Sequence, residues 1–279
     1  NPRVGREFEG MSIVPAAHRR RVLVVGGGIA GLVAAWVAAE RGHEVTLCER
    51  EGELGGILRT ERALPFKRDM FELGRTYALL CERAGVDIRL NTAVDAAFCD
   101  EFAADAVIVA VGSEPMRLPV PVEDGVRVLS IDDLYLDGAP VGNEIAVIGG
   151  GLTGCECALL MARQGKRAHV IEMREGLAID ANIRHRPILL AELEAAGVDE
   201  VLNAAASRVT STGVVVSEDG AERVIPADTV VCAIGQRSRS AMAEELRDVA
   251  PCVRIVGDAV RPANITTAVY EAWHAALDV

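Results

Sequence analysis

The chain has 279 residues, half of them hydrophobic, which is enough for one large domain or two ordinary ones with a sizeable core. Its formal net charge of −12 at pH 7 repels nucleic acid and anionic membranes, so we expect neither as a partner. Aromatic residues make up only 4% while glycine is abundant, a mixture that suits parallel sheets covered by closely packed helices.

The first apolar segment, 22–39, follows the basic run 18–21 and has the composition of a signal peptide or a membrane span. Three consecutive glycines, 26–28, would break a helix in its middle, and the same pattern recurs later in the chain. We therefore predict a buried strand over 21–25, a glycine turn, and a buried alanine-rich helix that ends near Gly42.

Strands and helices continue to alternate through the first half of the chain. We predict a strand over 44–49, a helix over 71–84 and a short strand over 86–90. An apolar block follows at 104–112, and Leu118-Pro119-Val120-Pro121 has the pattern of a linker that leaves this unit.

The second half of the chain repeats the first at a constant interval. Gly26–Gly31 matches Gly149–Gly154, and the block 104–112 matches 227–235, both displaced by 123 residues. Two motifs displaced by one interval indicate two copies of the same architectural unit. The elements expected in the second copy are strands over 145–148 and 168–172, a helix that ends near Gly165, a helix over 188–196, and strands over 209–217 and 222–225, the last two flanking Asp219-Gly220 as a hairpin turn.

The tail of the chain has no counterpart behind the first copy's Gly112. It contains a predicted strand over 253–256, then Gly257-Asp258 and a helix over 265–277. We infer that this tail returns to the first unit. The predicted fold class is α/β, with two tandem Rossmann-like dinucleotide-binding domains, the second inserted in the first; the domains are 21–118 plus 252–279, and 119–251.

Each glycine turn has the spacing of a dinucleotide fingerprint. Gly26, Gly28 and Gly31 are followed by Glu49, and Gly149, Gly151 and Gly154 by Glu172, in both cases 23 residues after the first glycine. The glycines permit a tight turn, close approach of a pyrophosphate and close helix packing, and the carboxylate accepts hydrogen bonds from the adenosine ribose. The alternative is a tight turn in a Rossmann-like unit that binds nothing.

The acidic residue of the second copy also bears on the choice of cofactor. Glu172 suits the free 2′-hydroxyl of NADH and repels the 2′-phosphate of NADPH, whereas Arg174, two residues on, weakens this preference. The sequence therefore favours NADH, with NADPH as the less favoured ligand.

The seven cysteines contain no CxxC pair, which argues against a disulfide framework or a zinc site. Cys155 and Cys157 form a CxC that is either redox-active or, as we favour, packed as small hydrophobic residues in a helix. We expect a reducing, cytoplasmic setting. The five histidines show no ligand spacing, and no catalytic residue or metal ligand is predicted.

Several of these residues together resemble the two-dinucleotide-binding-domain flavoproteins. The resemblance lies in Gly26–Gly31 with Glu49, in Leu54-Gly55-Gly56 and in Gly257-Asp258. It implies FAD in the first unit and NAD(P)H in the second, with the Gly55-Gly56 loop along the FAD and Asp258 on its ribityl chain. It also implies that the last helix points its N-terminus, Ile265 to Ala268, at the flavin ring.

The predicted sites follow from the fingerprints and this resemblance. The FAD site comprises Gly26, Gly28, Ile29, Ala30, Gly31, Glu49, Arg50, Gly55, Gly56, Leu58, Gly112, Gly257, Asp258 and Thr267. The NADH site comprises Gly149, Gly151, Leu152, Thr153, Gly154, Glu156, Glu172 and Gly235. Glu156 either faces the nicotinamide or is an ordinary helix-surface residue. Hydride transfer between stacked rings needs positioning more than acid–base catalysis.

A narrower resemblance concerns the start of the chain. Asn1-Pro2-Arg3-Val4-Gly5-Arg6-Glu7 resembles the segment after the iron–sulfur cysteines in the trimethylamine dehydrogenase, 2,4-dienoyl-CoA reductase and 2-enoate reductase family. The resemblance implies that 1–20 link to an N-terminal barrel of the same polypeptide carrying FMN and a [4Fe–4S] cluster. Electrons would pass from NADH through FAD and the cluster to FMN, which reduces an activated C=C bond. Gln236-Arg237-Ser238 departs from the family, which often has a proline after the arginine.

Two other functions stay open at this point. The chain is either such an electron-transfer module, without full turnover by itself, or a non-redox module that holds ADP or nothing and serves as a scaffold, as in amine dehydrogenases. Gly257-Asp258 favours a flavin, because ADP has no ribityl chain. A stand-alone NADH-dependent reductase of protein disulfides is disfavoured by the missing CxxC. A homo-oligomer is compatible with the sequence.

Overall fold

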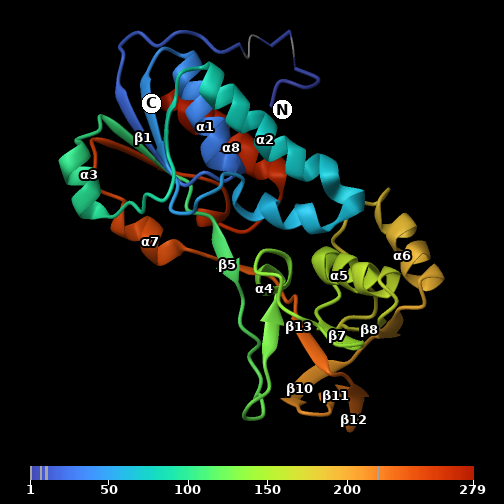
Figure 1. Cartoon of the computed structure of the whole chain (residues 1–279). Helices are drawn as coiled ribbons and strands as arrows, with labels where there is room; N and C mark the ends of the chain where they lie inside the picture. Colours follow the sequence, from blue (N-terminus) through green and yellow to red (C-terminus); the bar gives the residue numbers. More distant parts are fainter. Residues whose placement is uncertain (1, 7, 10–11, 219) are drawn as a thin grey trace. The chain divides into compact units, whose positions relative to one another are not determined.

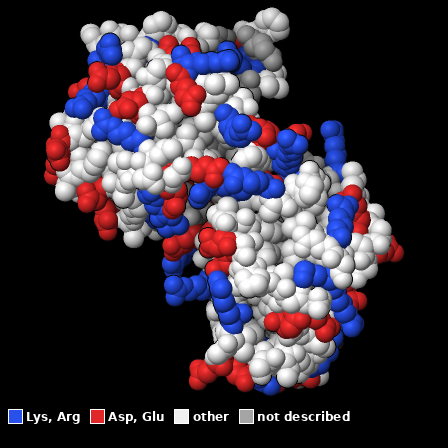
Figure 2. Space-filling view, in the orientation of Figure 1, with Lys and Arg blue, Asp and Glu red and all other residues white. Residues whose placement is uncertain are grey.

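The computed structural model describes residues 2–6, 8–9, 12–218 and 220–279 (Figure 1). The chain forms two compact units, one running to Glu114 and resuming over Arg237–Val279, the other comprising Pro115–Gln236. Over the described residues, no helix combines the length and the apolar composition that crossing a membrane requires. Figure 2 shows acidic and basic side chains interspersed over the visible face.

The first unit is built on a five-stranded parallel sheet. In spatial order its strands are β15 (Cys252–Ile255), β4 (Ala106–Val109), β1 (Arg21–Val25), β2 (Glu44–Cys48) and β3 (Asp87–Arg89). Side chains of β1 alternate between two cores, since Val22 and Val24 belong to one cluster of buried residues and Leu23 and Val25 to another. Both faces are therefore covered, which explains the continuous apolar run of this strand.

Helices cover both faces of this sheet. Figure 1 shows α1, α2 and α8 packed side by side, and their buried residues share one core with Val22 and Val24. The helices on the opposite face contribute Cys99, Phe102, Ala243 and Leu246 to the other core. The helices of the unit are α1 (Ile29–Glu40), α2 (Arg68–Arg83), α3 (Ala96–Phe102), α7 (Ser240–Glu245) and α8 (Ile265–Asp278), with 3₁₀ turns η1 (Gly56–Ala63), η2 (Pro65–Lys67) and η3 (Gly257–Ala259).

The second unit repeats this plan. Its parallel sheet has the order β6 (Val128–Ser130), β13 (Thr229–Cys232), β7 (Glu144–Ile148), β8 (Arg167–Ile171) and β9 (Asp199–Val201). Its helices are α4 (Ile131–Tyr135), α5 (Leu152–Arg163) and α6 (Arg186–Ala195). The four strands β4, β1, β2 and β3 correspond to β13, β7, β8 and β9, whereas the fifth strand is β15 from the tail in one unit and β6 in the other. The predicted doubly wound fold and the return of the tail to the first unit are found.

The predicted strand over 209–217 is wrong as a single element. A three-stranded antiparallel sheet forms instead from β10 (Ala205–Thr210), β11 (Gly213–Glu218) and β12 (Ala221–Pro226). The chain turns at Ser211-Thr212, because Gly213 adopts a positive φ of 139°, which glycine permits. Within the turn, Thr210 Oγ1 donates to the Gly213 carbonyl. The β11–β12 hairpin is present, and Gly220 in its turn has a φ of 82°, while Asp219 lies outside the described residues.

The connections between the units differ from the predicted boundaries at 118 and 252. The chain leaves the first unit after Glu114 and returns at Arg237. The return is early because α7 buries Ala243, and Leu246 directly after it is also buried, in the first unit's core. The two connecting strands, β5 (Ser113–Pro115) and β14 (Gln236–Ser238), pair as a two-stranded sheet.

In the predicted linker 1–20, Ile13 packs against the first core and the Ala16 N–H donates to the Arg41 carbonyl at 2.9 Å. Asn1 and Glu7 of the seven-residue resemblance lie outside the described residues.

Candidate dinucleotide sites

The first glycine turn is held by backbone contacts that no side chain would permit. Gly26 has a φ of 105°, and a Cβ there would overlap the Ala110 carbonyl. A Cβ on Gly31, one turn into α1, would overlap the Gly26 carbonyl oxygen. These two glycines therefore set the close packing of α1 against β1 and β4.

The second glycine turn has the same geometry. Gly149 has a φ of 109°, and a Cβ there would lie 2.5 Å from the Ala233 carbonyl oxygen. A Cβ on Gly154 would overlap the Gly149 carbonyl oxygen. The repeat detected in the sequence is thus a repeat of backbone contacts.

The two predicted acidic residues lie against the glycine turns in the same way. Glu49 is 7% exposed and Glu172 is 6% exposed. Glu49 Oε2 accepts from the Gly27 N–H at 2.7 Å, and Glu172 Oε2 accepts from the Gly150 N–H at 2.8 Å. The other oxygens accept from the N–H groups two residues on, at 2.9 Å in both units. Each carboxylate keeps lone pairs for further donors, such as ribose hydroxyls.

Gly27 and Gly150 lie directly against the two carboxylates, although the GxGxxG spacing does not identify these positions. A Cβ on Gly27 would lie 3.1 Å from Glu49 Cβ, and one on Gly150 would lie 2.7 Å from Glu172 Cβ. Each would also meet a leucine Cδ2 at 2.5 Å. The signal in the sequence is the run of three glycines, whose middle member gives the carboxylate room beside the turn.

The N-termini of α1 and α5 are open to an anion. Neither N-cap residue, Gly28 or Gly151, makes a side-chain cap hydrogen bond, and neither helix has an acidic residue in its first turn. The first N–H groups of a helix lack intrahelical partners, and they carry the positive end of its dipole. A Cβ on Gly151 would meet nothing within 4 Å, so the space above this turn is free. This donor set fits the pyrophosphate of a dinucleotide.

The residues predicted to bind next to these glycines differ in burial between the two units. Ile29 and Ala30 are buried in the first unit, whereas Leu152 is half-buried and Thr153 is exposed in the second. Only the backbone N–H groups of Ile29 and Ala30 are therefore suited to face a ligand.

The Gly55-Gly56 loop lies directly on the first glycine turn. The Gly55 N–H donates to the Gly27 carbonyl at 2.9 Å, and Gly28 and Gly55 form a parallel bridge. Gly55 has a φ of 115°, and a Cβ on Gly56 would lie 2.9 Å from Gly28 Cα. The loop therefore needs both glycines to approach the turn.

The late Gly257-Asp258 pair joins the same region from the tail. A Cβ on Gly257 would lie 3.0 Å from Ala30 Cβ, so the pair lies at the start of α1. Asp258 Oδ2 accepts from the Ser113 hydroxyl at 3.2 Å and Oδ1 from the Ala263 N–H at 3.1 Å. Ser113, directly after Gly112, was not predicted from the sequence, because its partner is 145 residues away.

Three other residues predicted for the FAD site have different surroundings. Leu58 is 4% exposed and packs in the first core. Arg50 is exposed and pairs with Glu51 at 3.1 Å. Thr267, in the first turn of α8, donates through its N–H and its hydroxyl to Asn264 Oδ1, at 3.0 and 3.2 Å.

In the second unit, Glu156 is not an ordinary surface residue. It is 1% exposed in α5, and its Oε1 lies 3.9 Å from His185 Nε2. Gly235, with a φ of 125°, ends the stretch after β13 as Gly112, with a φ of 70°, does after β4. The buried position of Glu156 removes the helix-surface alternative.

The cysteines are all free thiols. Cys155 and Cys157 are both 0% exposed, and burial raises the pKa of each to about 12. A thiol with so high a pKa forms little thiolate, so the interpretation of the CxC as small packed residues is favoured.

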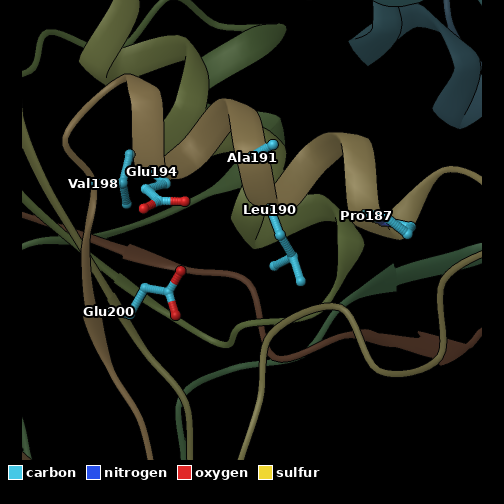
Figure 3. Close-up of a pocket in the computed structure, with 6 residues that line it drawn as sticks. All are labelled: Pro187, Leu190, Ala191, Glu194, Val198 and Glu200. Atoms are coloured by element: carbon cyan, nitrogen blue, oxygen red, sulfur yellow. The ribbon is translucent and has the colours of Figure 1, made fainter.

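A cavity of about 610 Å³ lies on α6 and β9 of the second unit (Figure 3). Leu190 and Ala191 give it an apolar wall, and the carboxylates of Glu194 and Glu200 border it. None of the predicted NADH residues lines this cavity, so it is separate from the glycine turn.

Comparison with known proteins assigns this chain to one family. A family model described as pyridine nucleotide-disulphide oxidoreductase matches residues 20–252. The chain is 36% identical to cinnamate reductase of Clostridium sporogenes over 282 residues, covering 100% of this chain and 42% of that protein. It is 33% identical to an NADH oxidase of Thermoanaerobacter brockii over 285 residues, covering 100% and 44%. The chain therefore spans less than half the length of these relatives.

Comparison with solved structures gives a result consistent with these sequence relatives. The chain is similar to 2-naphthoyl-CoA reductase, in a complex with 2-naphthoyl-CoA, with a TM-score of 0.94 and 29% identity over 100% of this chain and 43% of that one. It shares its fold with thioredoxin reductase from T. acidophilum, with a TM-score of 0.70 and 22% identity over 93% and 97% of the two chains.

Proposed function

Because this chain belongs to the pyridine nucleotide-disulphide oxidoreductase family, we propose that it is the module that takes electrons from NADH and passes them to FAD. The resemblance to the trimethylamine dehydrogenase, 2,4-dienoyl-CoA reductase and 2-enoate reductase family is confirmed by its similarity to cinnamate reductase and 2-naphthoyl-CoA reductase. Membership of this oxidoreductase family implies binding of FAD and of NAD(P)H.

The observation that carries the proposal is the duplicated glycine turn with its buried carboxylate. In each unit a helix begins without a side-chain cap, and Glu49 or Glu172 accepts a hydrogen bond from the N–H of the middle glycine. These are the donors for a pyrophosphate and the acceptor for a ribose. A fold that binds nothing has no need of the same arrangement twice.

The first unit has the additional residues that favour a full flavin over ADP. Gly257, the residue before Asp258, and the Gly55-Gly56 loop both lie next to the start of α1. We propose that Asp258, positioned by Ser113 and the Ala263 N–H, accepts hydrogen bonds from the ribityl chain. ADP lacks that chain, so the scaffold alternative gives Asp258 no role.

Bound together, NADH and FAD would supply a two-electron step in which hydride leaves nicotinamide C4 and adds to flavin N5. The chain's own contribution is to bind and orient the two dinucleotides, which needs fixed backbone donors more than an acid or a base. We propose that buried Glu156 belongs to the nicotinamide end of the second site, because it lies in the second turn of α5, close to the N-terminus of the helix.

Further steps depend on the rest of a longer protein. The relatives named as reductases are more than twice as long as the part matched here. We propose that electrons leave the FAD for an N-terminal barrel of the same polypeptide through a [4Fe–4S] cluster and FMN, and that an activated C=C bond is reduced there.

The test is the visible absorption spectrum of the purified chain, before and after anaerobic addition of NADH. An oxidised flavin spectrum that bleaches with NADH, and much less with NADPH, is the expected result. A colourless protein that takes up no FAD but releases ADP on denaturation would refute the proposal and support the scaffold alternative.

A further inference from the structure

The loop after β8 carries an ion pair beside the proposed adenosine ribose site. Arg174 Nη1 lies 2.7 Å from Asp180 Oδ2, and Arg174 Nε lies 3.4 Å from Glu172 Oε1. The guanidinium is therefore shared by two carboxylates, one of them the buried acidic residue of the fingerprint. The hydrogen bond with Asp180 also raises the pKa of Arg174, a side chain that is charged at neutral pH in any case.

The first unit provides an internal comparison for this loop. The interval of 123 residues pairs Leu54 with Leu177, whose Cδ2 atoms lie in the same place against the two middle glycines. At the same interval, Arg174 corresponds to Glu51 and Asp180 to Ile57. Both members of the ion pair are thus particular to the unit proposed to bind a nicotinamide dinucleotide.

The position of the arginine matters because NADPH differs from NADH in a single group near the adenosine ribose. NADPH carries a phosphate on the 2′-oxygen that the acidic residue would bind in NADH. Arginine binds phosphate through two parallel N–H donors, and a guanidinium two residues after Glu172 is within the same loop. In this structure those donors are directed at carboxylates.

We propose that Asp180 is a specificity-determining residue of the second unit. By holding Arg174, it withholds the guanidinium from a 2′-phosphate and leaves one net negative charge among the three side chains. The arrangement favours NADH over NADPH. This inference rests on the proposed function, since it presupposes that the second unit binds a pyridine dinucleotide.

The size of the effect follows from the exposure of the pair. The Asp180 side chain is 82% exposed and that of Arg174 is 40% exposed. Exposed ion pairs are weak, so releasing the arginine should strengthen the binding of a 2′-phosphorylated ligand by roughly twofold to fivefold. The remaining discrimination belongs to Glu172, whose carboxylate stays in place.

The experiment is isothermal titration calorimetry of the full chain with ADP-ribose and with 2′-phospho-ADP-ribose, which needs no flavin turnover. Asp180→Asn should tighten the binding of 2′-phospho-ADP-ribose by roughly twofold to fivefold and leave the affinity for ADP-ribose unchanged. Adding Arg174→Ala to Asp180→Asn should abolish the gain. A matched control is Glu222→Gln, which removes a carboxylate from another exposed pair of the same unit, 3.2 Å from Arg208, and should change neither affinity.

Each other outcome is decisive. An unchanged ratio of affinities in Asp180→Asn overturns the inference. A gain that survives Arg174→Ala also overturns it, because another cation of the loop, such as Arg184, then binds the phosphate. If the folded chain binds ADP-ribose but shows no change of ratio, only this inference fails. If it binds neither probe, the proposed function fails first.

Discussion

Two glycines of the first turn should respond very differently to the same added methyl group. A Cβ on Gly31 would overlap the Gly26 carbonyl oxygen, whereas one on Gly28 would lie 3.8 Å from Gly56 Cα, an ordinary contact. Gly28 also has φ −73° and ψ −178°, a conformation that alanine adopts without strain. The two substitutions therefore separate packing from ligand approach.

The expected magnitudes follow from these contacts. Gly28→Ala should change the stability of the ligand-free chain by less than about 1 kcal/mol, because alanine lowers the entropy of the unfolded state but is a poorer N-cap residue than glycine. Gly31→Ala should destabilise it by about 1–3 kcal/mol, because α1 must move away from β1 and this exceeds the helix propensity that alanine gains. Gly28→Ala should nonetheless weaken FAD binding by roughly tenfold to 150-fold, the equivalent of one lost hydrogen bond to a charged group.

The chain provides its own reporter for this measurement. Its two tryptophans, Trp36 in α1 and Trp273 in α8, both belong to the first unit, with ring centroids 5.9 Å apart. Urea unfolding followed by tryptophan fluorescence therefore reports the stability of this unit, and FAD titration reports binding. The reasoning is refuted if Gly28→Ala lowers the urea midpoint as much as Gly31→Ala, or if it leaves FAD affinity unchanged.

Three further predictions test the sites separately. Glu172→Gln should weaken ADP-ribose binding by roughly tenfold to 150-fold by calorimetry, since a charged acceptor is lost; Glu49→Gln, its match in the other unit, should leave that affinity unchanged, and equal effects would contradict two independent sites. Asp258→Asn should weaken FAD but not ADP, and a parallel loss of both would argue against a ribityl role. Cys155 and Cys157 should resist alkylation at pH 8 in the native chain and react after unfolding. Their folded pKa of about 12 exceeds the usual value of 9.0. Their contribution to the free energy of unfolding should therefore be complete below about pH 9 and fall as the pH rises towards 12, which unfolding measured as a function of pH would show.

Much of the fold could be predicted because the sequence contains two copies of the same architectural unit. The interval of 123 residues links Glu49 to Glu172, and the structure gives both carboxylates the same two backbone donors. Local apolar runs sufficed for the parallel strands, since these are buried on both faces.

What could not be predicted depends on contacts between distant residues or on local turns inside uniform sequence. Ser113 and Asp258 are 145 residues apart, and no motif spans such an interval. The turn before Gly213 interrupts a run of β-branched residues, so periodicity alone joined two strands into one. The helix at Ser240–Glu245 is only six residues long, and its place in the first unit depends on burial of Ala243 and Leu246.

The different origin of the two edge strands has a consequence for biosynthesis. The second unit takes its edge strand, β6, from the segment just before β7, so all of it is present once residue 236 has been made. The first unit takes β15 and α8 from the last part of the sequence. β15 pairs with β4, although the whole inserted unit lies between them in the sequence. On the ribosome the inserted unit can therefore fold first, while the surrounding unit waits with an open β4 edge and an uncovered face of α1. The time needed to synthesise the segment Arg237–Val279 thus sets the shortest period for which that unpaired edge stays exposed to other chains.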